Sequence, residues 1–374
     1  MAGFTPGELS VDQSGGAGYT LPIGIPAGVA GMQPELSINY SSGNGNGLLG
    51  VGFSLGGLSA ITRCGRTIVQ DGAVGGVEFT NSDRFCLNGQ RLVAISGEYG
   101  QSDTEYRTEI DSMARIISHD RQGNGPAWFS IETKSGQTIE FGNTKDSRIE
   151  AQGKSSAFAW AQNKLVDAVG NEITITYEEN NANTEYYPLH IDYSDNSVRF
   201  EYEDKEYTWV SYLAGSSVKA TKRMSKVNTW HGENKLGEYR FSYDIRDNKP
   251  ALLTSIQQCD GGNNCFPATT FDWQQPGEGF GEHLLTSDIC ANGSTANGVC
   301  NDGDNFNSIT FLDLNQDGKS DLVYRGDKGI TTFLSTGTGF QLASTSDICG
   351  NTRGSVCNDG DNHQYIFYPD INGD

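Results

Sequence analysis

Apolar and polar residues alternate along most of the first 275 positions of this chain. WFSIETKSGQTIEFGNT, KLVDAVGNEITITYEEN and HIDYSDNSVRFEYED each place two alternating runs around a short polar turn. The predicted turns are Ser135-Gly136, Gly170-Asn171 and Asp195-Asn196, because such residues tolerate the backbone angles of tight hairpins. A period of two is typical of strands with one buried face. Three successive hairpins predict a meandering antiparallel sheet, and therefore an all-β protein with an antiparallel, hairpin-rich domain.

The first 60 residues combine this alternation with many glycines. Residues 36–40 alternate like a half-buried strand. The spacing Gly45-x-Gly47-x-x-Gly50 matches a dinucleotide-binding loop, but that fingerprint requires a helix immediately afterwards. Three further glycines within residues 52–57 disfavour a helix there. We therefore interpret residues 45–57 as a glycine-rich loop between strands.

The pattern changes at about residue 277, where a repeat begins. The motif TSDIC starts at Thr286 and again at Thr345, 59 residues later, and each copy continues to VCNDGDN and a strand-like run. A period of this length is typical of four-stranded propeller blades. The sequence thus predicts a β domain at 1–275 and propeller repeats at 277–374, with the second repeat incomplete.

Within the repeat, DLNQDGKSD has the spacing of a calcium loop. Oxygen-bearing side chains two residues apart, with Gly318 in the turn, suit a hard cation that takes about six to eight oxygen ligands. Lys319 would contribute only its backbone carbonyl oxygen. The final residues, DINGD, begin a second copy. The alternative is a solvated Asp/Asn turn without a tightly bound ion. The predicted calcium ligands are Asp313, Asn315, Asp317, Lys319 and Asp321, followed by Asp370, Asn372 and Asp374.

The eight cysteines occur in local pairs, and two of these pairs occupy equivalent repeat positions. This pattern favours disulfides formed in an oxidising compartment. Zinc is the alternative, but no pair is CxxC and no histidine has ligand spacing. The first residues lack the basic and apolar stretches of a secretory signal, so we expect export by another route or a trimmed N-terminus. The predicted disulfides are Cys64–Cys86, Cys259–Cys265, Cys290–Cys300 and Cys349–Cys357.

The chain is acidic, with 47 Asp and Glu against 26 Lys and Arg and a net charge of −21. This charge disfavours nucleic-acid and anionic-lipid partners, which need a basic surface. No apolar run is long enough for a membrane span. No histidine lies in a GxSxG or HExxH setting and the sequence contains no GxxxxGK[ST] motif, so we expect no catalytic residue in this chain. The histidines are scattered, at positions His119, His190, His231, His283 and His363.

Three separated motifs resemble one family in the same order along the chain. They are the glycine-rich stretch from PGELSVDQSGG to SAITRC, RTIVQDG at 66–72, and DRFCLNGQRL at 83–92. They are similar to the amino-terminal domain of the SpvB virulence protein and of the B component of bacterial Tc insecticidal toxins. The segment NKLVDAVGNEITITY resembles YD/RHS repeats, and DLNQDGKSDLV resembles FG-GAP/VCBS blades of integrin-like propellers.

The resemblance implies a scaffold in a secreted toxin or virulence factor. In Tc toxins the B component and a C-type RHS partner form a hollow β-shell around a toxic polypeptide, and the propeller docks on an A-type translocation channel. We therefore expect a non-catalytic, encapsulating or translocating part, secreted and delivered towards the host cytoplasm. The expected partners are such toxin subunits or a downstream domain of the same chain.

Two alternatives remain open from the sequence. One is an extracellular adhesion or carbohydrate-binding module, because integrin-like blades and exposed acidic loops can serve recognition. The other is the amino-terminal part of an ADP-ribosylating toxin whose enzyme domain lies beyond residue 374. Ser344-Thr345-Ser346 and the Glu201/Glu203 pair match pieces of that enzyme's motif, but in reversed order, so we interpret them as coincidental.

Overall fold

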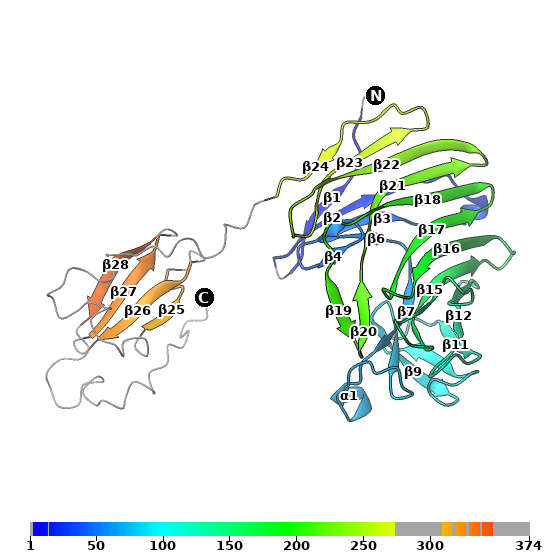
Figure 1. Cartoon of the computed structure of the whole chain (residues 1–374), viewed down its shortest axis with the longest axis horizontal. Coiled ribbons are helices and arrows are strands. Elements are labelled where there is room, and N and C mark those ends of the chain that lie inside the picture. The colour runs from blue at the N-terminus through cyan, green and yellow to red at the C-terminus, as the bar shows by residue number, and fades with distance from the viewer. Residues whose placement is uncertain are drawn as a thin grey trace. The chain divides into compact units, whose positions relative to one another are not determined.

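The protein is described by a computed structural model that covers residues 3–13, 15–273, 309–315, 319–326, 329–336 and 339–346. These residues belong to two compact units, Met1–Trp273 and Gln274–Asp374 (Figure 1). Their regular structure is almost entirely β-strand, with a short helix α1 (Ile68–Asp71) and a 3-10 turn (Val29–Gly31). The predicted all-β class is confirmed.

The first unit begins with a four-stranded antiparallel sheet in the order β1-β2-β3-β6. The glycine-rich segment forms strands and turns without a helix, as expected. At Gly57, where φ is +98°, an added Cβ would lie 1.9 Å from the carbonyl oxygen of Glu35, so only glycine fits. The strands are Glu8–Val11 (β1), Ala17–Pro22 (β2), Ser37–Ser41 (β3) and Phe53–Gly56 (β6), with Asn46–Gly47 (β4) and Gly50–Val51 (β5) as a separate ribbon.

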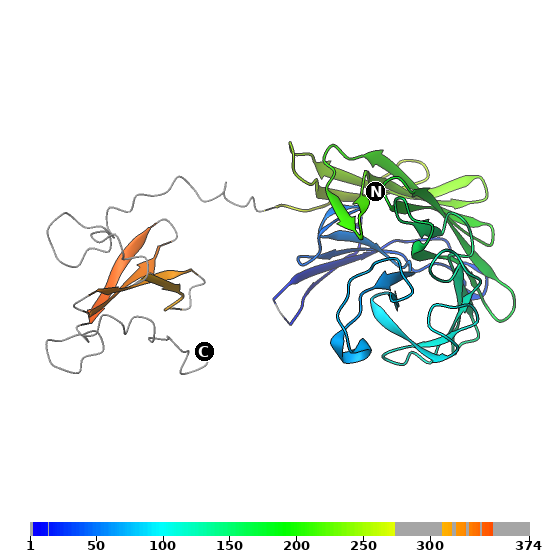
Figure 2. The ribbon, with the colours of Figure 1, turned by 60° about the horizontal axis from the view of Figure 1, so that its bottom comes forward.

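An eight-stranded barrel follows. Strands β7 to β13 pair antiparallel in sequence order, and β15 closes the ring because it pairs with both β7 and β13. Figure 2 shows the cyan strands of this barrel curving around one end of the unit. The strands are Ala60–Cys64 (β7), Arg84–Leu87 (β8), Gln90–Ser96 (β9), Glu105–Thr108 (β10), Arg115–His119 (β11), Trp128–Glu132 (β12), Thr138–Phe141 (β13) and Ala157–Val166 (β15); Arg148–Glu150 (β14) also pairs with β15.

The same β15 starts the predicted antiparallel meander, which is confirmed by the strand order β15-β16-β17-β18-β21-β22-β23-β24. Strands β19 and β20 leave it as a separate hairpin between β18 and β21 (Figure 1). The bounds are Glu172–Asn180 (β16), Glu185–Tyr193 (β17), Asn196–Asp204 (β18), Val210–Leu213 (β19), Ser216–Lys219 (β20), Lys222–His231 (β21), Asn234–Asp244 (β22), Leu252–Asp260 (β23) and Thr269–Thr270 (β24).

Two predicted turns are displaced. In the second hairpin the turn closes with a hydrogen bond from the Gly170 N–H to the Asp167 carbonyl, so Asn171 lies just beyond it. The third hairpin turns at Ser194-Asp195 instead of Asp195-Asn196, because Asn196 already pairs with Tyr193 in the ladder. Ser194 takes the left-handed conformation, with φ of +51°. The register aligns the buried Ile191 with the buried Val198 across β17 and β18. The burial of this pair therefore sets the register, and it outweighs the preference of the Asp-Asn dipeptide for the two turn positions.

The first unit has two hydrophobic cores. The larger core lies between the N-terminal sheet and the meander, where Leu21, Ile38 and Leu253 are fully buried; Figure 1 shows the blue strands behind the green ones. The second core fills the barrel around Trp160, whose ring centroid lies 5.3 Å from that of Phe85. Alternate residues of β15 therefore serve different layers, since this strand belongs to both the barrel and the meander.

In the second unit, the described residues form a four-stranded antiparallel meander, β25-β26-β27-β28. Its small core contains Leu322, Tyr324 and Phe333. Four strands in sequence order are the arrangement expected of one propeller blade; the propeller itself stays a prediction. The strands are Ile309–Leu312 (β25), Asp321–Gly326 (β26), Gly329–Ser335 (β27) and Phe340–Ser346 (β28).

Candidate functional site

The loop predicted to bind calcium connects β25 and β26, so strands flank it as the sequence suggested. Asp313, Asn315 and Lys319 are exposed on it, while Asp317 lies outside the described residues. Within the described part of the chain, no three His, Cys, Asp or Glu side chains lie close enough to hold a metal ion. The calcium site therefore stays a prediction that depends on Asp317 and on backbone oxygens.

Asp321, the last predicted ligand of this loop, is fully buried. Its Oδ2 accepts a hydrogen bond from the Leu314 N–H at 2.8 Å, and its Oδ1 accepts one from the Ser335 N–H at 2.7 Å. The carboxylate thus ties the loop to β27 through two backbone donors. This role is structural, and carboxylate oxygens retain further lone pairs with which a cation could be bound.

Several predicted site residues lie outside the described residues, so their predictions are untested. They are the second calcium loop, with Asp370, Asn372 and Asp374, and the cysteine pairs Cys290–Cys300 and Cys349–Cys357.

The first two cysteine pairs are disulfides in the structure. Cys64–Cys86 joins the neighbouring strands β7 and β8 of the barrel, 22 residues apart in sequence. Cys259–Cys265 closes a turn of only six residues after β23. No cysteine among the described residues is free. Both bonds lie in the first unit and join residues that are near neighbours in the fold.

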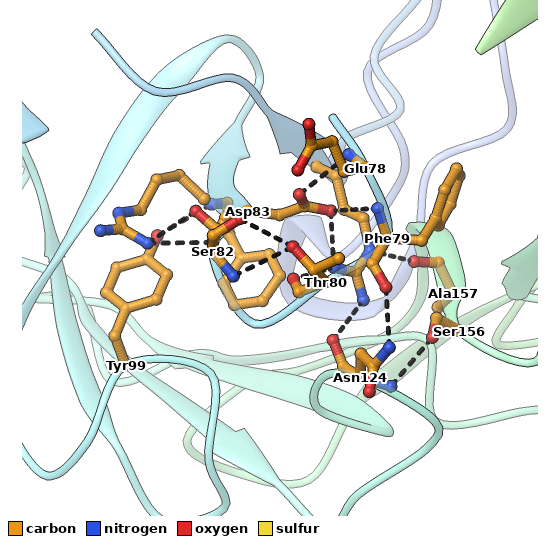
Figure 3. A network of polar contacts seen from close by, with 12 residues as sticks. Glu78, Phe79, Thr80, Ser82, Asp83, Tyr99, Asn124, Ser156 and Ala157 are labelled. Carbon is orange, nitrogen blue, oxygen red and sulfur yellow. Dashed lines mark hydrogen bonds and ion pairs between the residues drawn. The ribbon is translucent and has the colours of Figure 1, made fainter. Parts of the chain in front are cut away.

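A buried ion pair lies at one end of the barrel (Figure 3). Nη1 of Arg63 on β7 lies 3.0 Å from Oδ2 of Asp83, and both side chains are fully inaccessible to solvent. The remaining guanidinium nitrogens donate to backbone carbonyls: Nε to Ala157 at 2.6 Å and Nη2 to Asn124 at 2.8 Å. Burial lowers the pKa of Arg63, and Asp83 opposes that shift. Because its guanidinium nitrogens all have partners, we interpret this buried ion pair as a structural contact that holds these segments together.

The Asp83 carboxylate also organises the loop before β8. Its oxygens accept hydrogen bonds from the backbone N–H groups of Glu78 at 3.0 Å and Phe79 at 2.8 Å. Asn124 connects this loop to the segment between β11 and β12, since its Nδ2 donates to the Phe79 carbonyl at 2.9 Å. Figure 3 shows Phe79 and Asp83 of this loop beside Asn124, which lies in the segment between β11 and β12. One side chain, Asp83, therefore satisfies a guanidinium and two backbone donors at once.

A second cluster forms around Asp71, at the end of α1. Its carboxylate binds Arg84 (2.8 Å) and Arg91, and it accepts a hydrogen bond from the Thr67 N–H at 2.9 Å. Burial alone would raise the pKa of Asp71, but these hydrogen bonds and the positive charge of Arg91 lower it to about 2. Asp71 is therefore ionised near neutral pH and cannot act as a proton donor there.

The pieces that resembled a transferase motif have structural partners. Glu201 and Glu203 lie on β18, where Glu203 pairs with Arg223 at 2.6 Å and Glu201 lies 3.4 Å from Lys226. Ser344 lies on β28 in the other unit. Both glutamates pair with residues of the neighbouring strand β21. This packing role agrees with the interpretation that their match to the transferase motif is coincidental.

One serine and one histidine contact each other in the barrel. Nε2 of His119 lies 2.7 Å from Oγ of Ser130, and the His119 ring stacks on Trp128 with centroids 3.8 Å apart. Desolvation by burial lowers the pKa of His119. These residues lie on the adjacent strands β11 and β12, and none of them lines either of two hollows of about 580 and 520 Å³ in the first unit. We interpret the contact as cross-strand packing.

Sequence reasoning missed the charged residues of these two clusters: Arg63, Asp71, Asp83 and Arg91. A signal existed, because these residues lie in or beside the three motifs that carried the family resemblance. The first two motifs each supply one partner of an ion pair, and the third motif supplies the partners of both, so the motifs encode connections between these segments. The fold and these clusters define a class of protein: a β-scaffold whose buried charges hold its strands and loops together.

The chain belongs to the SpvB family. The family model described as "Salmonella virulence plasmid 65kDa B protein" matches residues 11–255, which covers the barrel and most of the meander. Two curated relatives, the mono(ADP-ribosyl)transferases SpvB of Salmonella typhimurium and Salmonella dublin, are each 28% identical over 199 residues. Each match covers 46% of this chain and 32% of the relative, so the chain corresponds to about a third of the length of those proteins.

Solved structures share the fold. The N-terminal domain of the effector SpvB from Salmonella typhimurium LT2 has a TM-score of 0.55 at 19% identity, over 64% of this chain and 98% of that one. TcdB2-TccC3 has a TM-score of 0.65 at 16% identity, over 92% of this chain and 20% of that one. The Photorhabdus luminescens Tc holotoxin pore has a TM-score of 0.63 at 15% identity, over 94% and 20%. At these identities the likeness establishes the fold.

Among the described residues, no helix has the length and apolar character that crossing a bilayer requires.

Proposed function

We propose that this chain is a non-catalytic structural part of a secreted toxin or virulence factor, acting in encapsulation or translocation. The observation that carries the proposal is the shared fold with both the SpvB N-terminal domain and TcdB2-TccC3. The barrel supports it, because its buried charges are consumed by internal partners such as Arg63–Asp83. A C-type RHS subunit is the partner that this role requires, with an A-type channel as the next contact.

Cryo-electron microscopy of the native assembly tests this role. The chain would carry an affinity tag in the producing bacterium and would be purified with whatever subunits accompany it. We expect a closed shell in which residues 1–273 form part of the wall. A separate SpvB-like domain tethered to a folded enzyme, with no shell, would favour the ADP-ribosylating alternative. Transfer of ADP-ribose from labelled NAD to actin by the purified chain alone would overturn the non-catalytic role.

We also propose that the loop of residues 313–321 binds calcium and that secretion supplies both the ion and the oxidising conditions for the disulfides. Strands flank the loop, and Asp321 anchors it to β27. Such an ion would crosslink the loop, and binding to the folded state alone would stabilise that state.

Calcium removal is therefore expected to lower the melting temperature of the second unit. If the ion is present at about 100 times its Kd, it contributes about 2.7 kcal/mol, which corresponds to roughly 10–20 °C for a unit of this size. Differential scanning calorimetry of the whole chain, with calcium and with excess chelator, measures this shift. The transition of residues 1–273 serves as the internal control. Superimposable scans in both buffers would contradict the calcium site.

A further inference from the structure

A second feature of the first unit is independent of the proposed scaffold role. A hollow of about 580 Å³ opens at the base of the β19–β20 hairpin. Its walls come from the β4–β5 ribbon, β15, the start of β17, and the hairpin with the segments beside it. Pockets of this size accommodate small ligands. The hairpin pairs with no other sheet among the described residues, so it forms one wall of the hollow as a separate arm (Figure 1).

Aromatic rings dominate this hollow: Phe158, Tyr186, Tyr207 and Trp209. Trp209 is 67% exposed, although tryptophan is highly buried on average. The strand period explains its orientation, because Trp209 and Ser211 line the hollow while the intervening Val210 does not. An indole ring exposed at a hollow is a stacking surface for a ligand with an apolar face and a polar rim.

Several polar groups that line the hollow have no partner among the described residues, among them the hydroxyl of Tyr186, the ammonium of Lys219 and the buried Oδ1 of Asn46. Burial raises the pKa of Tyr186, so its hydroxyl stays protonated and can donate. Glu185 differs, since its oxygens accept from the Thr221 N–H at 2.7 Å and from its hydroxyl at 2.6 Å. The hollow thus offers ring faces and hydrogen-bond donors, while its buried carboxylate is already used.

We propose that this hollow binds a neutral oligosaccharide. The C–H face of a sugar ring would stack on Trp209, and its hydroxyl oxygens would accept from Tyr186 and Lys219. An apolar peptide side chain would match the rings but would leave both donors without acceptors, which costs binding energy. The net charge of −21 disfavours an acidic glycan through long-range repulsion. A neutral saccharide satisfies the ring faces and the donors together.

Binding of defined sugars by the purified 374-residue chain tests the proposal. The probes are maltohexaose, cellohexaose and chitohexaose, supplemented by an array of neutral and sialylated glycans and an array of random peptides. Isothermal titration calorimetry quantifies each binder found. We expect saturable binding of at least one neutral glycan, and replacement of Trp209 by alanine is expected to weaken it at least tenfold. Lys219→Met should also weaken it, because one hydrogen-bond donor is lost.

Tyr212 provides the matched control. It is 73% exposed on the same hairpin but does not line the hollow, so Tyr212→Ala should change the affinity less than twofold. Unchanged circular dichroism and melting temperatures show that the variants are folded. Binding confined to peptides or sialylated glycans would overturn the proposal, as would an absence of glycan binding. Equal losses from Trp209→Ala and Tyr212→Ala would also overturn it.

Discussion

Replacement of Asp83 by alanine is expected to lower the free energy of unfolding of the first unit by about 3–5 kcal/mol. The variant leaves the guanidinium of Arg63 in a fully buried site without its counter-charge. It also removes the acceptor of the Glu78 and Phe79 N–H groups. The destabilisation exceeds the net stabilisation that the intact ion pair provides. The buried guanidinium has lost its hydration, and in the variant no opposite charge compensates for that loss.

The matched control for Asp83 is Asp204, which pairs with Lys222 at 2.6 Å and is 83% exposed. Its replacement by alanine should cost less than about 1 kcal/mol, since water screens an exposed pair. Urea unfolding of both variants, followed by tryptophan fluorescence, compares the two ion pairs under identical conditions. A loss below about 1 kcal/mol for Asp83→Ala would show that the barrel relaxes around Arg63 or admits water.

Local patterning predicted the strands well, because hydrophobic alternation reports which face of a strand is buried. The hairpins around Gly136 and Gly170 form where expected, and both glycines have a positive φ. The closure of the barrel was not predictable in this way. It requires Ile61 of β7 to pair with Trp160 of β15, about a hundred positions later in the sequence. Alternation says which face is buried but does not name the distant partner strand.

The buried ion pairs could not be predicted from the sequence for a related reason. Aspartate and arginine are rarely fully buried, so Asp83 and Arg63 look like surface residues in a single sequence. Only their position in the family motifs hinted at a role. Asp321 is a different case: its spacing predicted a metal ligand, which stays a prediction, and the structure adds that its buried carboxylate accepts hydrogen bonds from two backbone N–H groups. Spacing thus located an important carboxylate, but its partners could be assigned only once the folded backbone was known.

Loss of the Cys64–Cys86 disulfide is expected to have the second largest effect, a destabilisation of about 3 kcal/mol. The bond closes a loop of 22 residues and so removes conformations from the unfolded chain. That loop contains α1 with Asp71 and the segment before β8 with Asp83. The bond therefore also limits the conformations that these two aspartates must search before they form their ion pairs. Its effect should therefore exceed that of Cys259–Cys265, which spans only six residues and should contribute about 2 kcal/mol.

Paired cysteine-to-serine variants, unfolded in urea under oxidising conditions, separate the two bonds. The variant lacking Cys64 and Cys86 should unfold at the lower urea concentration, and the variant lacking Cys259 and Cys265 provides the matched control. Under reducing conditions all three proteins should converge towards the stability of a chain without either bond. If both variants unfold together with the unmodified protein, residual structure already restrains the 22-residue loop in the unfolded ensemble. The ion pairs, rather than the disulfide, would then stabilise the barrel.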